Sequence, residues 1–118
     1  MTKKSSGLSI KLEPNLKGGN GTVRILNILE KEELYGLGRL FAVSIIPPGA
    51  SIGQHTHEGD FETYYILKGR ARVNDNGNVA ELGPGDMTQC KDGDFHSIEN
   101  IGDEDLEYLA VILYTKEK

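Results

Sequence analysis

Two histidines that are separated by one residue and followed by a glutamate are the side chains best suited to chemistry in this chain. His55 and His57 lie in the stretch GQHTHEGDFETYYILKG, and Glu62 comes five residues after His57. Side chains two apart share a face of an extended strand, so both imidazoles point the same way. In the next strand-like run Glu62 shares a face with Tyr64. An antiparallel neighbour would bring Glu62 opposite the histidines.

The third histidine, His96, stands at the start of another strand-like run, just after a turn that contains glycine. Three imidazoles and one carboxylate suit first-row divalent metals such as Mn, Fe, Co, Ni, Cu or Zn, and not Ca. An octahedral ion held by four such ligands keeps two positions open, which is typical of a catalytic site. Each residue alone has a plainer explanation, with Glu62 as a solvated surface residue and His96 as a hydrogen-bonding one. The combination accounts for every histidine and indicates a metal site.

The composition limits the class of protein. A chain of 118 residues is expected to form one domain, residues 1–118, and its 15 glycines favour many turns and an all-β fold. A net charge of −5 without a basic patch argues against nucleic acid or a membrane surface as partner. Cys90 is the only cysteine, so no intrachain disulfide forms. With no signal-like or membrane-length apolar run, we expect a cytoplasmic protein.

Short strands that alternate with turn signals predict a sandwich or barrel. Residues 1–21 are expected to form a loosely ordered lead-in or a dimer-contact arm, and Glu30–Gly38 a short helical turn or loop. The sequence NDNGN, residues 74–78, is a hairpin signal. The expected strands are Val23–Leu29, Arg39–Ile46, Gly53–His57, Thr63–Leu67, Arg70–Asn74, Val79–Leu82, Met87–Cys90, Phe95–Asn100 and Leu106–Tyr114.

The spacing of the candidate ligands resembles the two sequence motifs of the cupin superfamily. The first motif, G(X)5HXH(X)3–4E(X)6G, is matched at all of its fixed positions, which here are Gly49, His55, His57, Glu62 and Gly69.

The second motif, G(X)5PXG(X)2H(X)3N, is matched by Gly85, Gly93, His96 and Asn100, while Lys91 stands in place of the usual proline. The chain is similar to small bacterial single-domain metal-binding cupins.

This resemblance implies an all-β double-stranded β-helix, the cupin jelly-roll barrel. It assigns the metal ligands as His55, His57, Glu62 and His96, and one divalent transition metal as the cofactor, with Mn, Fe or Ni expected before Zn. It also implies a homodimer, for which residues 8–29 are the natural contact because an exposed sheet edge needs covering.

The resemblance leaves the activity open, because one fold hosts many chemistries. Our first hypothesis is dioxygenase-like chemistry on a small oxygenated, anionic substrate, with Glu62 and Tyr64 as catalytic residues. A decarboxylase would need a further acidic proton donor, and only Glu58 and Asp60 are near in sequence. The alternatives are a small-molecule or metal-binding protein without turnover, and a redox-neutral isomerase or decarboxylase.

Other polar residues have both a functional and a structural explanation. Tyr64 could donate to a bound substrate or serve as a core aromatic, and Cys90 is expected to be a small buried hydrophobe. Gln54 and Gln89 could orient the histidines, although backbone carbonyls could do the same.

The charged residues near the motifs are expected mostly at the surface. Glu58 and Asp60 are interpreted as the solvated rim of a turn. Alternation with core residues turns Arg70 and Arg72 outward, and Arg39 is undetermined.

Overall fold

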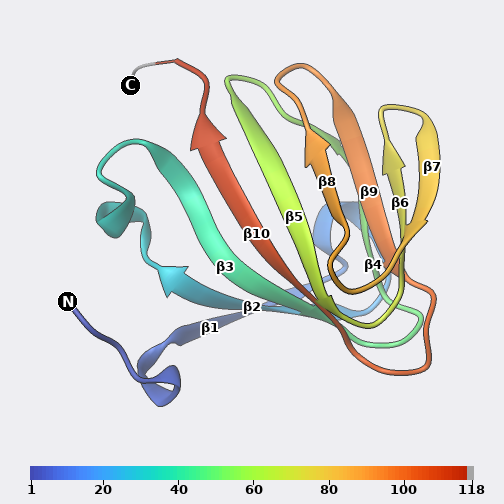
Figure 1. The fold of residues 1–118 in the computed structure, drawn as a ribbon, viewed down its shortest axis with the longest axis horizontal. Coiled ribbons are helices and arrows are strands. Elements are labelled where there is room, and N and C mark those ends of the chain that lie inside the picture. The colour runs from blue at the N-terminus through green and yellow to red at the C-terminus, as the bar shows by residue number, and fades with distance from the viewer. Residues whose placement is uncertain (117–118) are drawn as a thin grey trace.

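The computed structural model describes residues 1–116, and strands make up most of its regular structure (Figure 1). Three short 3-10 helices, η1, η2 and η3, span Ser5–Gly7, Leu16–Gly18 and Lys31–Leu34. The first five strands are β1 (Ser9–Pro14), β2 (Thr22–Leu29), β3 (Gly38–Ile46), β4 (Ser51–Thr56) and β5 (Asp60–Lys68). The other five are β6 (Ala71–Asp75), β7 (Asn78–Leu82), β8 (Met87–Cys90), β9 (Phe95–Asn100) and β10 (Leu106–Tyr114).

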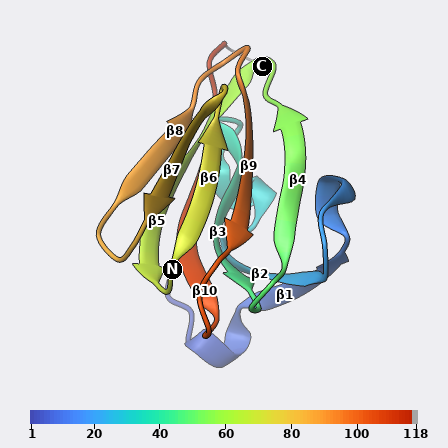
Figure 2. The ribbon, with the colours of Figure 1, turned by 90° about the vertical axis from the view of Figure 1, so that its right-hand side faces the viewer.

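The strands form two antiparallel sheets that pack face to face. The six-stranded sheet has the order β1-β2-β3-β10-β5-β8. The four-stranded sheet has the order β4-β9-β6-β7, and Figure 2 shows these four strands next to one another. The chain passes repeatedly between the sheets, so strands far apart in sequence, such as β3 and β10, become neighbours. The expected all-β architecture of a double-stranded β-helix is confirmed.

Every strand expected from the sequence is present, with ends that differ by at most three residues. The turn between β6 and β7 has Asn76 at φ 53° and Gly77 at φ 94°, as a two-residue hairpin requires. The segment 1–21 contains a strand, β1, which pairs with β2 at the edge of the larger sheet.

The core lies between the inner faces of the two sheets, where buried apolar residues from both meet. In one inner row of the larger sheet the small side chains of Ala42 and Ala110 stand next to Tyr64. Small residues in this row make room for the large Tyr64 side chain inside the barrel.

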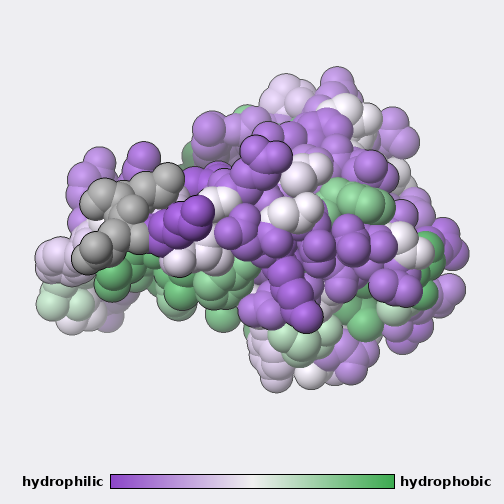
Figure 3. Space-filling view, turned by 90° about the horizontal axis from the view of Figure 1, so that it is seen from above, coloured by the Kyte–Doolittle hydropathy of each residue, from purple (hydrophilic) through white to green (hydrophobic). Residues whose placement is uncertain are grey.

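The outer faces of the two sheets differ in polarity. One row of opposed residues crosses all six strands of the larger sheet and consists of apolar or aromatic side chains: Ile10, Leu26, Val43, Leu109, Tyr65 and Met87. The view from above shows hydrophobic surface along the lower left border of the molecule (Figure 3). A water-facing sheet surface normally carries polar side chains, so this face is unusual for a free surface.

Among residues 1–116, helices are confined to single short turns, and none has the length and apolar character that crossing a membrane requires.

Candidate metal centre

The four expected ligands come from both sheets and meet inside the barrel. His55 lies in β4 directly opposite His96 in β9, and His57 follows the end of β4. Glu62 lies in β5, in the other sheet. The expectation that a neighbouring strand places Glu62 opposite the histidines is therefore wrong. Glu62 reaches them from across the barrel, because β4 pairs with β9 and β5 pairs with β10 and β8.

The ligand atoms of these four residues all lie within 4.8 Å of one another, so the cluster could hold a metal ion. His96 Nε2 is 3.0 Å from His55 Nε2, 3.1 Å from His57 Nε2 and 3.1 Å from Glu62 Oε1. Two ligands at about 2.1 Å from one ion and at right angles to each other are about 3.0 Å apart. The donor set therefore fits the ligand spacing of an octahedral ion, with positions left for a further ligand.

The hydrogen bonds behind two of the histidines fix which nitrogen faces the centre. His55 Nδ1 donates to the carbonyl of Gly53 at 2.8 Å, and His57 Nδ1 donates to Asp60 Oδ1 at 2.7 Å. A carbonyl and a carboxylate only accept, so in the neutral rings both Nε2 atoms carry lone pairs. These lone pairs converge with the Glu62 carboxylate on one point, an arrangement that a cation stabilises.

The charges in the cluster also favour a cation. Burial raises the pKa of Glu62, but contacts with His55, His57 and His96 lower it by more, so this pKa lies well below the usual range and Glu62 is ionised. The Glu62 carboxylate, with Asp60 adding to it and burial opposing it, raises the pKa of His57. The centre is thus a buried site with negative charge and a strong attraction for positive charge.

Asp60 is a supporting residue whose role the sequence interpretation missed. It is buried, not part of a solvated rim, and it bridges His57 to Arg39, whose Nε lies 2.9 Å from Asp60 Oδ2. Burial raises the pKa of Asp60, and the bonds with Arg39 and His57 lower it by more. The signal was present, because Asp60 has the same strand parity as Glu62 and so faces inward with it.

We expect Asp60→Ala to lower metal affinity by about 10- to 100-fold, because it leaves the His57 Nδ1–H group without its acceptor. Glu58→Ala is the matched control, since it removes an exposed carboxylate from the same turn. A competition titration against a chelating dye measures both variants. Equal affinities would mean that Asp60 does not orient His57.

A backbone carbonyl, and not a glutamine side chain, orients the His55 ring. Gln54 is exposed on the outer face of β4, and Gln89 bonds Thr63 at 3.4 Å, so neither orients a histidine as the sequence suggested. The acceptor for His55 is Gly53, whose backbone packs against η2 so closely that a Cβ there would lie 2.0 Å from the Lys17 carbonyl oxygen. Only glycine allows this contact.

A cavity of about 390 Å³ leads to the cluster and is bounded on one side by the β1–β2 arm. His55, His57 and Glu62 lie in its wall. The other polar residues that line it are Lys11, Glu13, Lys17, Asn27, Glu30, Lys31, Arg39, Ser44, Thr56, Tyr64 and Tyr108. Tyr64 stacks on the His96 ring at 5.1 Å, so the expectation that it faces the pocket agrees with its position.

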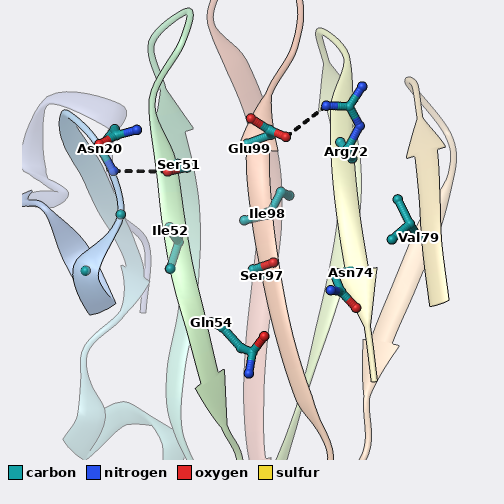
Figure 4. A pocket seen from close by; sticks show the side chains of 13 residues that line it. Asn20, Ser51, Ile52, Gln54, Arg72, Asn74, Val79, Ser97, Ile98 and Glu99 are labelled. Carbon is teal, nitrogen blue, oxygen red and sulfur yellow. Dashed lines mark hydrogen bonds and ion pairs between the residues drawn. The ribbon is translucent and has the colours of Figure 1, made fainter. Parts of the chain in front are cut away.

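A second hollow of about 370 Å³ lies on the outer face of the smaller sheet (Figure 4). The labelled side chains of Gln54, Ser97 and Asn74 come from three neighbouring strands there, and Arg72 bonds Glu99 at 3.0 Å. It contains none of the four clustered ligands, so we place the ligand site in the cavity that does.

The other residues considered in the sequence, Cys90, Arg70, Arg72 and Lys91, do not belong to the ligand cluster. Burial raises the pKa of Cys90 to about 12, which keeps its thiol protonated, and Cys90 is not in the ligand cluster. Arg70 and Arg72 are exposed and pair with Glu81. The turn at Lys91 forms without proline, with the Asp94 amide donating to the Lys91 carbonyl at 3.0 Å.

Comparison with known proteins agrees with the fold. The family model of the Cupin domain matches residues 42–112. An oxalate-binding protein of Thermotoga maritima is 44% identical over 113 residues, which cover 96% of this chain and 93% of that protein. An uncharacterized protein of Methanocaldococcus jannaschii is 29% identical, covering 85% of this chain and 78% of its own.

Solved structures extend the comparison. The crystal structure of a "predicted oxalate decarboxylase" from Thermotoga maritima matches with a TM-score of 0.92 and 44% identity, over 97% of this chain and 99% of that one. A protein of Thermus thermophilus has a TM-score of 0.73 at 21% identity, over 96% of each chain, and shares the fold. The matched segment contains all four clustered residues and extends over most of the barrel, so the chain belongs to the cupin family.

Proposed function

We propose that this protein holds one divalent transition metal at His55, His57, Glu62 and His96, and binds a small dicarboxylate such as oxalate there. The convergence of imidazole lone pairs and a carboxylate at the wall of an open cavity supports this above all. The 44% identical oxalate-binding protein supports the class of ligand. We expect Mn, Fe or Ni before Zn.

The electrostatics of the cavity support an anionic ligand. Lys17 and Lys31 line it and would attract an anion towards the metal, while Lys11 is paired with Glu13 and Arg39 with Asp60. Once bound, the metal would act as a Lewis acid towards the ligand's oxygens. Tyr64 would donate a hydrogen bond to the ligand, since burial raises its pKa well above the usual value and keeps it protonated.

The first test is calorimetric titration of oxalate into the protein loaded with Mn(II), with the metal-free protein as control. We expect saturable binding with one oxalate per chain to the loaded protein and none to the metal-free form. Acetate, with one carboxylate, is the comparison ligand and should bind more weakly. Equal binding with and without metal, or no binding of oxalate, would overturn the proposed function.

Turnover is a separate question that the same preparation answers. Dioxygenase-like chemistry stays a prediction and requires oxygen consumption in the presence of substrate. Release of formate without oxygen uptake would favour the redox-neutral alternative instead. Saturable binding with neither oxygen consumption nor formate release would favour a binding protein.

We also propose that two copies pack through the outer face of the larger sheet. Ile10 and Leu12 on the edge strand β1 are 59% and 61% exposed; Ile10 belongs to the apolar row that crosses the sheet, and Leu12 lies next to it on the same face, opposite Arg24. Arg24 and Glu107 lie on the same face. A twofold axis presents the same patch to itself, so a second copy can match apolar surface to apolar surface and pair these opposite charges.

The smaller sheet supports this choice of face. Its outer side carries Gln54, Ser97 and Asn74, as a water-facing sheet should (Figure 4). A cytoplasmic location, and the absence of nucleic-acid or membrane partners, stay predictions.

A further inference from the structure

Buried polar atoms are normally paired, and only two buried side-chain atoms among residues 1–116 lack a partner: Asp75 Oδ1 and Tyr108 Oη. Asp75 is not part of the cavity wall, but Tyr108 is. Tyr108 is also fully buried, at 0% exposure. A buried phenol that makes no hydrogen bond costs free energy unless something comes close enough to accept one.

The position of Tyr108 relative to the metal ligands is fixed by strand register. It lies in β10 opposite Ser44 of β3 and packs its ring against Tyr64 at 4.4 Å. Tyr64 in turn stacks on His96. The phenol of Tyr108 is therefore part of the larger sheet's inner face, one aromatic ring away from the metal ligands.

The chemistry of this phenol suits an anion. Burial and the nearby Glu62 charge raise the pKa of Tyr108, so its hydroxyl keeps its proton and acts as a donor. Ser44 contributes a second hydroxyl to the same wall of the cavity. A small dicarboxylate has oxygens left over when some of them bind a metal, and a neutral hydroxyl can donate a hydrogen bond to such an oxygen without adding charge.

We infer that Tyr108 is a specificity-determining residue, whose hydroxyl donates a hydrogen bond to a ligand oxygen that the metal does not hold. The inference rests on the proposed function, since it assumes an anionic ligand in this cavity. The residue's role is distinct from metal binding, because Tyr108 is absent from the ligand cluster.

The test compares oxalate binding to the wild type and to Tyr108→Phe, both loaded with Mn(II). We expect the variant to bind oxalate about 10- to 100-fold more weakly, because a hydrogen bond to a charged group is lost. Its metal content should not fall, because Tyr108 is not one of the clustered ligands. Its metal-free melting temperature should change little, because the hydroxyl makes no hydrogen bond of normal geometry with its neighbours Ser44 and Tyr64. Tyr65→Phe is the matched control, because Tyr65 is on the outer face of β5.

The possible outcomes separate the two proposals. If the wild type binds oxalate and Tyr108→Phe binds it equally well, the inference is wrong and the proposed function stands. A large fall in the melting temperature of metal-free Tyr108→Phe would mean that the hydroxyl is structural, which also overturns the inference. If the wild type does not bind oxalate, the proposed function fails and this inference fails with it.

Discussion

His96→Ala is expected to purify with almost no bound metal, whereas the wild type carries close to one ion per chain. His96 Nε2 is within 3.1 Å of ligand atoms of all three other residues, so its loss removes the centre of the donor set. Loss of a supporting residue alone costs about 10- to 100-fold in affinity, so loss of a direct ligand should cost at least about 100-fold. Mass spectrometry of metals in untagged protein measures the content.

The same variant should lose its stabilisation by metal. At a free metal concentration 100 times the dissociation constant, binding stabilises the folded protein by about 2.7 kcal/mol, and a 100-fold weaker site leaves about 0.4 kcal/mol. Ser97→Ala is the matched control, because Ser97 is the next residue of β9 and points to the other face. An unchanged metal content and melting shift in His96→Ala would refute the assignment.

The four clustered residues could be predicted from sequence because their spacing resembles the cupin motifs. His55 and His57 share one extended segment, and the register of β4 with β9 brings His96 beside them. The strands were predictable as well, since glycine-containing turns separate short apolar runs. Strand β1 escaped prediction because half of its short run is polar, and its pairing with β2 supplies what its own sequence lacks.

The supporting residues could not be assigned in the same way, because their roles depend on contacts between distant strands. Arg39 is in β3 and reaches Asp60, which is 21 residues away. Tyr108 faces the cavity only because β10 pairs with both β3 and β5. The sequence LEYLAVILY gives Tyr108 the parity of Leu106 and Ala110, but it does not say that this side of the strand is a cavity wall.

Leu12→Lys is expected to convert the proposed homodimer into a monomer at micromolar concentration. Leu12 is 61% exposed on the outer side of β1, so the change should leave the fold intact. A twofold dimer contains the substitution twice, and each lost leucine costs about 1.5–3 kcal/mol of apolar burial. Association should therefore weaken by about 10²- to 10⁴-fold. Light scattering after size-exclusion chromatography measures the mass of each species.

Val79→Lys is the matched control for the effect of adding a surface lysine. Val79 is 63% exposed, so the substitution adds the same charge and removes an equally exposed apolar side chain, but from β7 in the smaller sheet. If the larger sheet's outer face forms the interface, Val79→Lys stays a dimer while Leu12→Lys does not. Dissociation of both variants would point to charge repulsion, and persistence of the Leu12→Lys dimer would place the contact elsewhere. Lys11 and Glu13 of the same strand line the cavity. Measuring oxalate binding to a monomeric Leu12→Lys variant would therefore also show whether ligand affinity depends on a second copy that holds β1 in place.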